Sequence, residues 1–530
     1  MQRQQNRNIQ ARHFLALAVV ILSSLLIKII NEHSLPYWLD EGYTAWFANL
    51  SFHDIWFWLP EIEAHPPVYY SLVRLWGIVE ADETGIWHRS LSIFISLLLI
   101  ATTYVATRKV ARYLQIDDAG ATLFNSILIC FSPVIVWYSI EARPYILLFF
   151  AYSLTVLGLI SILSDGEDDT LRGWVVFTFG AVLTNWSHHL GGIFSAVLFL
   201  SLFAHWTVER KFEKRFFLKI LFCTIIVLAV SAPLIVQILK QLLYWQESSW
   251  VAEPTLTSFV QIMRRIFGFG YADKYMDVAF GGYSVVWAAR IGLGILVSLV
   301  SGALVLLGLC KLVQQKKVSL ACFFVLSCFA VPVISALISF LGPNIFLERT
   351  LLPGLIPYFL LLSISIEYID KSTFRNAVKA LYIVVIGLGL FATLRAAEKE
   401  PWDQIMASID GEARENDVIL LLPNDLYLPA RLYVDETQLA AKIESVPAEY
   451  PAQTFSDFYP DGFPAVPGIR PEDADSIRSL IKGKDRVFLV TREEALFDPN
   501  HVTRSVLAEE YASATVKQWD NIHVERFDRR

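Results

Sequence analysis

The sequence is short of charged residues. Only 18% of its 530 residues are Asp, Glu, Lys or Arg, whereas 55% are hydrophobic, and the mean hydropathy is +0.47. A soluble chain usually carries about 25% charged residues, because its surface must stay wetted. Disorder, a collagen-like chain and a disulfide scaffold are excluded. The net charge of -7 also argues against a nucleic-acid partner, which would require basic stripes to neutralise phosphates. The composition is that of an integral membrane protein.

Cysteines are few, and motifs for nucleotide or metal binding are missing. All five cysteines lie in or at the end of apolar runs, and none has a CxxC spacing. This placement favours small buried thiols in helices over disulfides or metal ligands. The sequence contains no Walker motif and no metal spacing such as HExxH.

Long apolar runs are abundant. A helix needs about 20 mostly apolar residues to cross a bilayer, and eleven runs approach that length. They lie at 14–30, 89–107, 119–138, 145–163, 172–186, 189–206, 216–239, 285–310, 318–340, 351–369 and 378–394. No small-x-small cleavage site follows the first run, so we expect a retained helix and not a signal peptide. The sequence predicts a polytopic α-helical membrane protein with about 11 transmembrane helices.

Lysine and arginine are distributed unevenly between alternate loops. The opposite loops 31–88 and 341–350 hold one arginine each, whereas the loops 165–172 and 240–284 depart from the pattern. Basic residues gather before the first run and in four alternate loops, at Arg3, Arg7, Arg12, Arg108, Lys109, Arg112, Arg210, Lys211, Lys214, Arg215, Lys311, Lys316, Lys317, Lys371, Arg375 and Lys379. Basic loops stay in the cytoplasm. We therefore predict a multi-pass protein of the cell membrane with a cytoplasmic N-terminus and, after eleven spans, an extracytoplasmic C-terminus.

The chain changes character near residue 395. Two segments of helical spacing alternate with two short apolar runs typical of buried strands, at 402–413, 417–422, 476–481 and 486–490. No Gly-rich phosphate loop follows the first of these runs. The sequence predicts a C-terminal soluble α/β domain over 395–530, outside the membrane, after a transmembrane domain over 1–394.

The first outer loop, 31–88, begins with an unusual pair of carboxylates. Asp40 and Glu41 follow the first span almost directly. Adjacent carboxylates repel each other, and burial raises the cost of ionising either. Such groups at a bilayer usually serve an ion path, a substrate or a catalyst; a solvated loop pair is the alternative.

The same loop contains a histidine in front of two prolines. His65 is followed by Pro66, Pro67 and then by Tyr69 and Tyr70. The prolines fix two φ angles and restrict His65 to extended geometry. They would hold the imidazole rigidly at the mouth of a cavity, although a lone histidine at an interface is more often structural.

Three further sites fall on the predicted outer face. Glu141 and Arg143 lie in the turn between the third and fourth runs, where they could simply pair with each other. His188 lies between the fifth and sixth runs, and Arg349 precedes the tenth. A planar guanidinium binds a phosphate through two hydrogen bonds. Outside the cytoplasm no ATP or nucleotide sugar is at hand, so an activated donor would have to be linked to a lipid.

These residues belong to a series of motifs that runs along the whole chain. The segments are Asp40-Glu41-Gly42-Tyr43-Thr44-Ala45, His65-Pro66-Pro67-Val68-Tyr69-Tyr70, Arg89, Glu141-Ala142-Arg143-Pro144-Tyr145, Trp186-Ser187-His188, Glu348-Arg349-Thr350-Leu351-Leu352-Pro353 and Pro401-Trp402-Asp403. In order and spacing the series resembles the bacterial GT-C glycosyltransferases, in the group of the protein O-mannosyltransferases and aminoarabinose lipid A transferases (glycosyltransferase family 39-like). Ile140, Pro144 and Thr350 depart from the family's glutamine, methionine and tyrosine.

The resemblance implies a GT-C-like fold and a membrane glycosyltransferase, transferring a hexose or a pentose. The sugar would pass from a polyprenyl-phosphate donor to a lipid, glycan or protein acceptor outside the cytoplasmic membrane. The nearer relatives generally need no divalent metal, so we expect no cofactor and no metal site. We expect the α/β domain to govern acceptor choice and not bond chemistry.

The resemblance also implies roles for individual residues. A carboxylate must take the proton of the acceptor hydroxyl, and cationic groups must stabilise the departing phosphate. The catalytic candidates are Asp40, as the base, and Glu41; the donor phosphate candidates are Arg349, His65 and Arg143; the substrate candidates are Glu141, Tyr69, Tyr70 and His188.

Two other classes remain open. A transporter or flippase of lipid-linked sugars would also place polar groups near the outer face, but transporters usually show polar groups at mid-membrane and repeated, broken helices. No duplicated half is visible in the sequence. A non-catalytic membrane sensor would use the outer domain to bind a ligand.

Overall fold

The computed structural model describes residues 2–32, 34–57, 59–63, 65–80, 87–164, 171–244, 254–267, 284–342, 344–396, 398–434, 439–452 and 466–530. The chain divides into two compact units. Unit 1 consists of Met1–Glu32, Arg89–Leu239 and Val251–Ala397, and unit 2 of His33–His88, Lys240–Trp250 and Glu398–Arg530. Most of the two loops that depart from the charge pattern, 165–172 and 240–284, lies outside the described residues. The division of the chain at residue 394, predicted from the sequence, stays a prediction.

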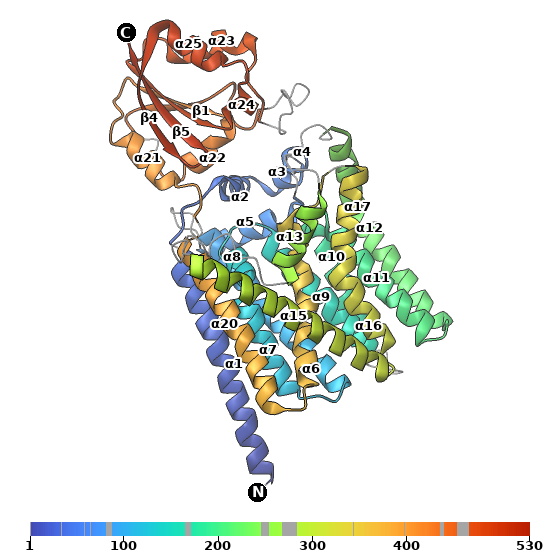
Figure 1. Ribbon diagram of the computed structural model, residues 1–530. Coiled ribbons are helices and arrows are strands. Elements are labelled where there is room, and N and C mark those ends of the chain that lie inside the picture. Colours follow the sequence, from blue (N-terminus) through green and yellow to red (C-terminus); the bar gives the residue numbers. More distant parts are fainter. Residues whose placement is uncertain are drawn as a thin grey trace. The chain divides into compact units, whose positions relative to one another are not determined.

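Unit 1 is built of helices (Figure 1). They are α1 (Gln2–Glu32), α6 (Trp87–Tyr113), α7 (Asp118–Phe131), α8 (Pro133–Ser139), α9 (Tyr145–Ser164), α10 (Leu171–Ser187), α11 (Gly191–Val208), α12 (Lys214–Tyr244), α13 (Leu256–Phe267), α15 (Ser284–Gln314), α16 (Val318–Val325), the π-helical η3 (Leu326–Ala330), α17 (Val331–Leu341), α18 (Glu348–Leu351), the 3-10 turn η4 (Leu352–Gly354), α19 (Leu355–Glu367) and α20 (Ser372–Ala396). Each of the eleven predicted apolar runs lies in these helices.

The lengths and apolar character of the helices are those of a multi-pass membrane protein. Within the described ranges, nine helices are long and apolar enough to cross a membrane. The pair α7 and α8, bent by 58°, would make a tenth if it forms one span. The remaining predicted run corresponds to α10, whose 17 residues stand at the lower end of the range of about 17–25 for a spanning helix.

The bend between α7 and α8 has a local cause. Pro133 is the first residue of α8 and has no N–H with which to continue the hydrogen-bond ladder of α7, so the chain changes direction there. At its other end α7 is capped by Asp117, whose carboxylate accepts hydrogen bonds from the N–H groups of Ala119 and Gly120, both at 3.1 Å. The bend directs α8 toward the turn that carries Glu141 and Arg143.

Helices α9 and α10 pack in close contact through small residues. A Cβ atom built on Gly158 would lie 2.3 Å from the backbone N of Phe177, and one on Gly180 would lie 2.6 Å from the N of Thr155. Only glycine fits at these two positions, as in close helix pairs of other membrane proteins. The contact matters for the site because α9 begins at Tyr145 and α10 ends next to His188.

Unit 2 joins four helices of the first loop to a mixed α/β domain. The loop helices are α2 (Leu39–Asn49), α3 (Phe52–Phe57), α4 (Leu59–Ile62) and α5 (Val68–Glu80). The domain contains α21 (Trp402–Asp410), β1 (Val418–Leu422), η5 (Asn424–Leu426), α22 (Tyr427–Ala430), β2 (Lys442–Ser445), η6 (Pro471–Asp473), α23 (Ala474–Ile481), β3 (Arg486–Arg492), α24 (Glu494–Phe497), α25 (Val502–Glu510), β4 (Tyr511–Trp519) and β5 (Ile522–Arg529).

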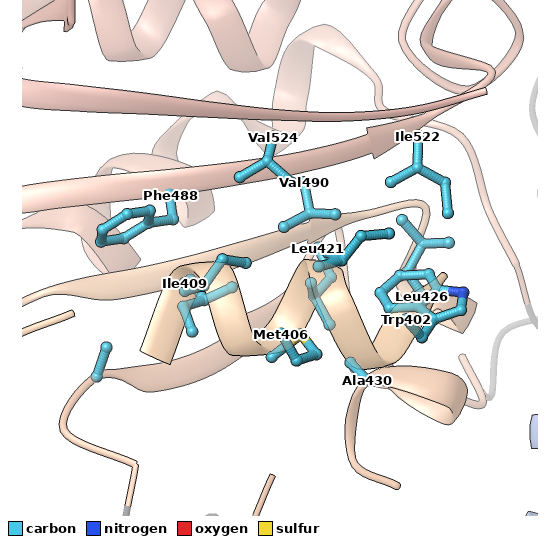
Figure 2. Close-up of a cluster of buried hydrophobic side chains, with 13 residues drawn as sticks. Trp402, Met406, Ile409, Leu421, Leu426, Ala430, Phe488, Val490, Ile522 and Val524 are labelled. Carbon is cyan, nitrogen blue, oxygen red and sulfur yellow. The ribbon is translucent and has the colours of Figure 1, made fainter. Parts of the chain in front are cut away.

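The sheet of the domain has five strands in the order β2-β1-β3-β5-β4. β1 pairs in parallel with β2 and β3, whereas β5 pairs antiparallel with β3 and β4. Figure 2 shows Trp402, Met406 and Ile409 of α21 packed against the apolar side chains of β1, β3 and β5. Helices α23 and α25 cover the other face of the sheet (Figure 1).

The predicted α/β character of this domain is confirmed. The helices predicted at 402–413 and 476–481 correspond to α21 and α23, and the strands predicted at 417–422 and 486–490 correspond to β1 and β3. Strands β2, β4 and β5 were not predicted. Most side chains of β4 are exposed at the edge of the sheet, so β4 lacks the apolar signal that marks β1.

Candidate functional site

The carboxylate pair lies in the first turn of α2 in unit 2. Asp40 is half-buried, and Glu41 is completely buried. The helix begins without a side-chain cap from its own sequence. The N–H of Leu39, one of the groups that a helix start leaves unsatisfied, instead donates to Glu400 Oε2 at 3.2 Å. The C-terminal part of unit 2 therefore supplies a cap for the helix that carries both carboxylates.

Glu41 forms an ion pair with a lysine far away in the sequence. Lys399 Nζ lies 2.9 Å from Glu41 Oε2, and the two side chains are only 3% and 0% exposed. The same ammonium lies 5.7 Å from the centre of the Trp38 ring. A charge buried to this degree requires a partner, and Lys399 is the partner of Glu41. Lys399 and Glu400 were not among the predicted site residues, although they directly precede the Pro401-Trp402-Asp403 motif.

Asp40 shares a helix face with Phe47, because residues seven apart in a helix lie on one side. The Phe47 ring packs edge-on against Tyr70 of α5, with a centroid distance of 5.0 Å. Tyr69, whose ring is 5.9 Å from that of Tyr70, is fully buried as well. Tyr70 therefore supports the face of α2 that carries Asp40, and Tyr69 packs against Tyr70.

His65 is held by a neighbouring carboxylate. Its Nδ1 forms a short hydrogen bond and ion pair with Glu63, and both side chains are 9% exposed. Pro66 and Pro67 follow and lead directly into α5. Glu63 was not among the predicted site residues, although its position two residues before His65 is a signal that could have identified it.

In unit 1, three motifs that are far apart in the sequence meet at Tyr145. The Arg349 guanidinium carbon lies 5.5 Å from the centre of the Tyr145 ring, within range of a cation–π contact. On the same tyrosine, the His188 ring lies at a centroid distance of 6.1 Å. We call Arg349, Tyr145 and His188 the tyrosine cluster. Tyr145 was part of a motif but was not predicted as a site residue.

The imidazole of His188 is oriented by the backbone. Its Nδ1 accepts a hydrogen bond from the N–H of Leu190 at 3.1 Å. A neutral histidine that accepts at Nδ1 carries its proton on Nε2. His188 can therefore present a donor through Nε2.

Glu141 and Arg143 lie in the turn between α8 and α9, two residues before the tyrosine cluster begins. Both side chains are buried. The turn is held by the Arg143 N–H, which donates to the Glu141 carbonyl at 2.9 Å, and by Ser92 Oγ, which donates to the same carbonyl at 2.7 Å. Buried Arg89, also of α6, donates to the Glu32 carbonyl at the end of α1. The predicted polar groups of unit 1 thus gather at one end of its helices.

Glu348, the residue before Arg349, forms an ion pair with an arginine of another helix. Its carboxylate Oε2 lies 2.7 Å from Arg265 Nη1 of α13. This ion pair ties α13 to α18, the short helix that carries Arg349. Arg265 was not among the predicted site residues.

Metal-ligating side chains do not cluster in the part of the chain that the structure describes. No group of three or more His, Cys, Asp or Glu side chains there could hold a metal ion. The prediction that no metal takes part stays a prediction.

Solved structures share this fold. A crystal structure of the Archaeoglobus fulgidus oligosaccharyltransferase with Zn and sulfate aligns with a TM-score of 0.52 at 14% identity, over 91% of this chain and 68% of that chain. The same oligosaccharyltransferase tethered with an acceptor peptide aligns with a TM-score of 0.50 at 13% identity, over 97% and 73%. The apo crystal structure of ArnT from Cupriavidus metallidurans aligns with a TM-score of 0.48 at 13% identity, over 98% of both chains. No family model and no curated protein sequence matches the chain.

The GT-C fold predicted from the motifs is thereby confirmed. The oligosaccharyltransferase likeness covers both the helices and the C-terminal part of the chain. The protein is a polytopic α-helical membrane protein of GT-C fold with a C-terminal α/β domain. At identities of 13–14% the likeness concerns the fold and not the roles of individual residues.

Proposed function

We propose that the protein is a glycosyltransferase that moves a sugar from a polyprenyl-phosphate donor to an acceptor on the extracytoplasmic side of the membrane. The acceptor hydroxyl attacks the anomeric carbon, a new glycosidic bond forms, and the bond from that carbon to the lipid phosphate breaks. The sugar is a hexose or a pentose, and the acceptor is a lipid, a glycan or a protein.

The tyrosine cluster is the observation that carries this proposal. It brings the Arg349 guanidinium to a buried tyrosine at the end of a membrane helix, and His188 Nε2 carries a proton beside it. A guanidinium and an N–H donor suit a lipid phosphate, which gains negative charge as it leaves. Buried Arg143 lies in the adjoining turn.

A lipid-linked donor agrees with the rest of the molecule. The turn after β1, Leu422-Pro423-Asn424-Asp425, contains no glycine, so it lacks the Gly-rich backbone that cradles a nucleotide's phosphates. A polyprenyl phosphate enters from the membrane and requires no nucleotide site. The distribution of basic loops supports a cytoplasmic N-terminus and an extracytoplasmic position for the motif-bearing end of unit 1.

The chain's own residues take complementary roles. Asp40 accepts the proton of the acceptor hydroxyl, and Glu41 lies beside it in the first turn of α2. Arg349, His65 and Arg143 bind the donor phosphate. Glu141, Tyr69, Tyr70 and His188 complete the substrate site, and no divalent metal takes part in the reaction.

A transfer assay tests the proposal. Purified protein in lipid nanodiscs is incubated with a radiolabelled polyprenyl-phosphate sugar and a cell-envelope extract as acceptor, with and without EDTA. We expect free polyprenyl phosphate and labelled acceptor to appear in equal amounts, with EDTA making no difference. The proposal fails if label crosses the bilayer of proteoliposomes while it stays attached to the lipid, since that result identifies a flippase. Ligand binding without turnover would identify a sensor.

A further inference from the structure

Helix α2 is attached to the C-terminal part of unit 2 on several sides. Glu41 meets Lys399 in a buried ion pair, and the Leu39 N–H donates to Glu400. On another side, a Cβ atom built on Gly42 would lie 2.9 Å from the backbone N of Pro429 in α22. The helix that carries Asp40 therefore rests against the chain beyond residue 398 at successive positions of its first turn.

A network of buried charges extends these contacts into the sheet. Tyr43 OH of α2 donates to Asp425 Oδ2 at 2.8 Å, and Asp425 lies in η5, the short turn that follows β1. Arg492, at the end of β3, lies 3.5 Å from the Asp425 carboxylate and 3.8 Å from that of Glu400. The Trp402 indole N–H donates to Glu400 Oε2 at 2.9 Å. The residues that contact α2 or support these contacts thus lie at the carboxyl ends of β1 and β3, two adjacent parallel strands.

These contacts define the rotation of α2 about its axis. Consecutive residues of a helix point about 100° apart, so Glu41, Gly42 and Tyr43 together reach around most of the helix. A rotation of the helix about its axis would separate Glu41 from Lys399. It would also bring a residue with a side chain to the place where Gly42 faces α22, which has no room for a Cβ atom. The face that remains, shared by Asp40 and Phe47, is the one supported by Tyr70 of α5.

We propose that Glu41 is a positioning residue, and that through its ion pair with Lys399 the α/β domain sets the orientation of α2 and so the position of the Asp40 carboxylate. This inference rests on the proposed function for the role of Asp40. From the sequence, we expected the α/β domain to govern acceptor choice. In this proposal the domain also influences the transfer step, because its ion pair with Glu41 positions Asp40.

The physical basis is the cost of breaking a buried pair. Buried ion pairs contribute little to stability in themselves, but removal of one partner leaves an uncompensated charge, which must move or find another partner. If Lys399 is removed, Glu41 has to leave its place, and α2 rotates with it. A misplacement of about 1 Å in a catalytic group costs about 10²-fold in rate.

The test uses the full-length protein in nanodiscs and two readouts. Hydrogen–deuterium exchange of the amides of residues 39–49 reports on α2, and steady-state transfer reports kcat and the donor KM. The variants are Lys399→Met, Lys399→Arg and the charge exchange Glu41→Lys with Lys399→Glu. Lys517→Met is the matched control, because Lys517 also pairs with a glutamate of the same domain, Glu412 at 2.7 Å, but is 42% exposed.

We expect Lys399→Met to speed exchange in α2 and to lower kcat by about 10- to 100-fold, with a smaller change in KM. Lys399→Arg and the charge exchange should restore both readouts in large part, and Lys517→Met should change neither. Faster exchange in Lys399→Met with an unchanged kcat would overturn the inference, since the contact would then be structural only. So would a charge exchange that restores α2 but not kcat, because Glu41 would then act on the substrate itself.

The two proposals fail in different ways. If the parent protein transfers no sugar, the proposed function fails and the role of Asp40 with it, while the exchange data still show whether Lys399 holds α2. If the parent transfers sugar and Lys399→Met equals it in both readouts, only the positioning role is overturned.

Discussion

Residues of the same type in this protein differ in burial and in the side chains that they contact. Glu41 and Asp40 are adjacent carboxylates, yet Glu41 is completely buried with Lys399, whereas Asp40 is half-buried on another face of the same helix. Consecutive side chains of a helix cannot easily serve one reacting atom. The structure therefore gives the two carboxylates different surroundings.

Replacement of Asp40 by asparagine tests its assignment as the base. Asp40→Asn keeps the size and hydrogen bonding of the side chain but removes its ability to accept a proton. We expect kcat to fall by about 10²–10⁴-fold while donor binding persists, measured by transfer and by lipid-binding assays. Glu41→Gln should cost less, because an amide oxygen can still accept from Lys399. Asp54→Asn, at a more exposed carboxylate of the same loop, is the control; a larger loss in Glu41→Gln than in Asp40→Asn would contradict the assignment.

In the proposed function, Arg349 binds the donor phosphate. Arg349→Lys keeps the charge but loses the planar fork and weakens the contact with Tyr145. A charge-assisted hydrogen bond contributes about 1.5–3 kcal/mol, so the donor Kd should rise by about tenfold or more. Titration of the protein with polyprenyl phosphate measures the change. Arg172→Lys, at an exposed position at the start of α10, should bind like the parent; equal binding by Arg349→Lys would mark Arg349 as structural.

At the scale of elements, close contacts between helices hold the functional residues in place. Gly158 and Gly180 bring α9 and α10 together and so fix Tyr145 next to His188. Gly42 does the same for α2 and α22. In each case the neighbouring helix occupies the space that a side chain larger than that of glycine would need.

A methyl group at position 42 tests the packing of α2. In Gly42→Ala the new Cβ would lie 2.9 Å from Pro429 N and 3.0 Å from the Leu428 carbonyl carbon, and backbone atoms cannot easily move aside. Overpacking of this kind costs about 1–3 kcal/mol, which thermal unfolding should report as a lower Tm. Gly192→Ala is the matched control, because nothing lies within 4 Å of its Cβ. An unchanged Tm in Gly42→Ala would mean that α2 does not pack on α22 in this way.

The network around α2 should make stability depend on pH. Burial raises the pKa of Glu400 above its ordinary 4.5, although Arg492 and the Trp402 hydrogen bond oppose the shift. The folded state therefore binds this proton more tightly than the unfolded state. Its contribution to stability is present below the unfolded pKa and is lost as the pH rises through the folded pKa.

Glu400→Gln removes this titration and keeps an oxygen that can accept from Leu39 and Trp402. We expect the stability of the parent, relative to the variant, to fall as the pH rises from about 4 toward neutrality, with unfolding temperatures measured in steps across that range. A parallel pH dependence in the two proteins would contradict the raised pKa. The comparison with the variant cancels the titration of other carboxylates.

At the scale of the whole molecule, the distribution of basic loops predicts the direction of the chain in the membrane. The basic loops predict that the loop after α9 is cytoplasmic and that the α/β domain is extracytoplasmic. In a protein without its native cysteines, Ser164→Cys should be shielded from an impermeant thiol reagent in intact cells. Ser476→Cys, on the exposed face of α23, should react. Reaction of both sites, or of neither, would contradict the predicted number of spans.

Much of this architecture was accessible from the sequence. All eleven apolar runs are helical, and α21, α23, β1 and β3 lie within a few residues of their predicted places. The motif order predicted the GT-C fold, which the oligosaccharyltransferase structures confirm. These features can be predicted because each depends on local properties of the sequence: the length of an apolar span, the periodicity of a helix, or the short apolar run of a buried strand.

Other features depend on contacts between distant residues and leave no local trace. Strand β4 has exposed side chains and exists because β5 offers it a hydrogen-bonding edge. The sequence could name Tyr145 as part of a motif, but not as the ring on which Arg349 and His188 meet. Each of these contacts requires the fold to bring together segments that are far apart along the chain.

The sequence by itself determined that this is a membrane protein, where its helices run and which polar residues are candidates for function. Composition and short-range pattern carry that information, because a bilayer imposes the same demand on every span. Only the tertiary structure decided which candidates act together and which partner each one has. Lys399 reaches Glu41 across 358 positions, and burial then makes the pairing obligatory, since a lone charge in that place would be too costly to keep.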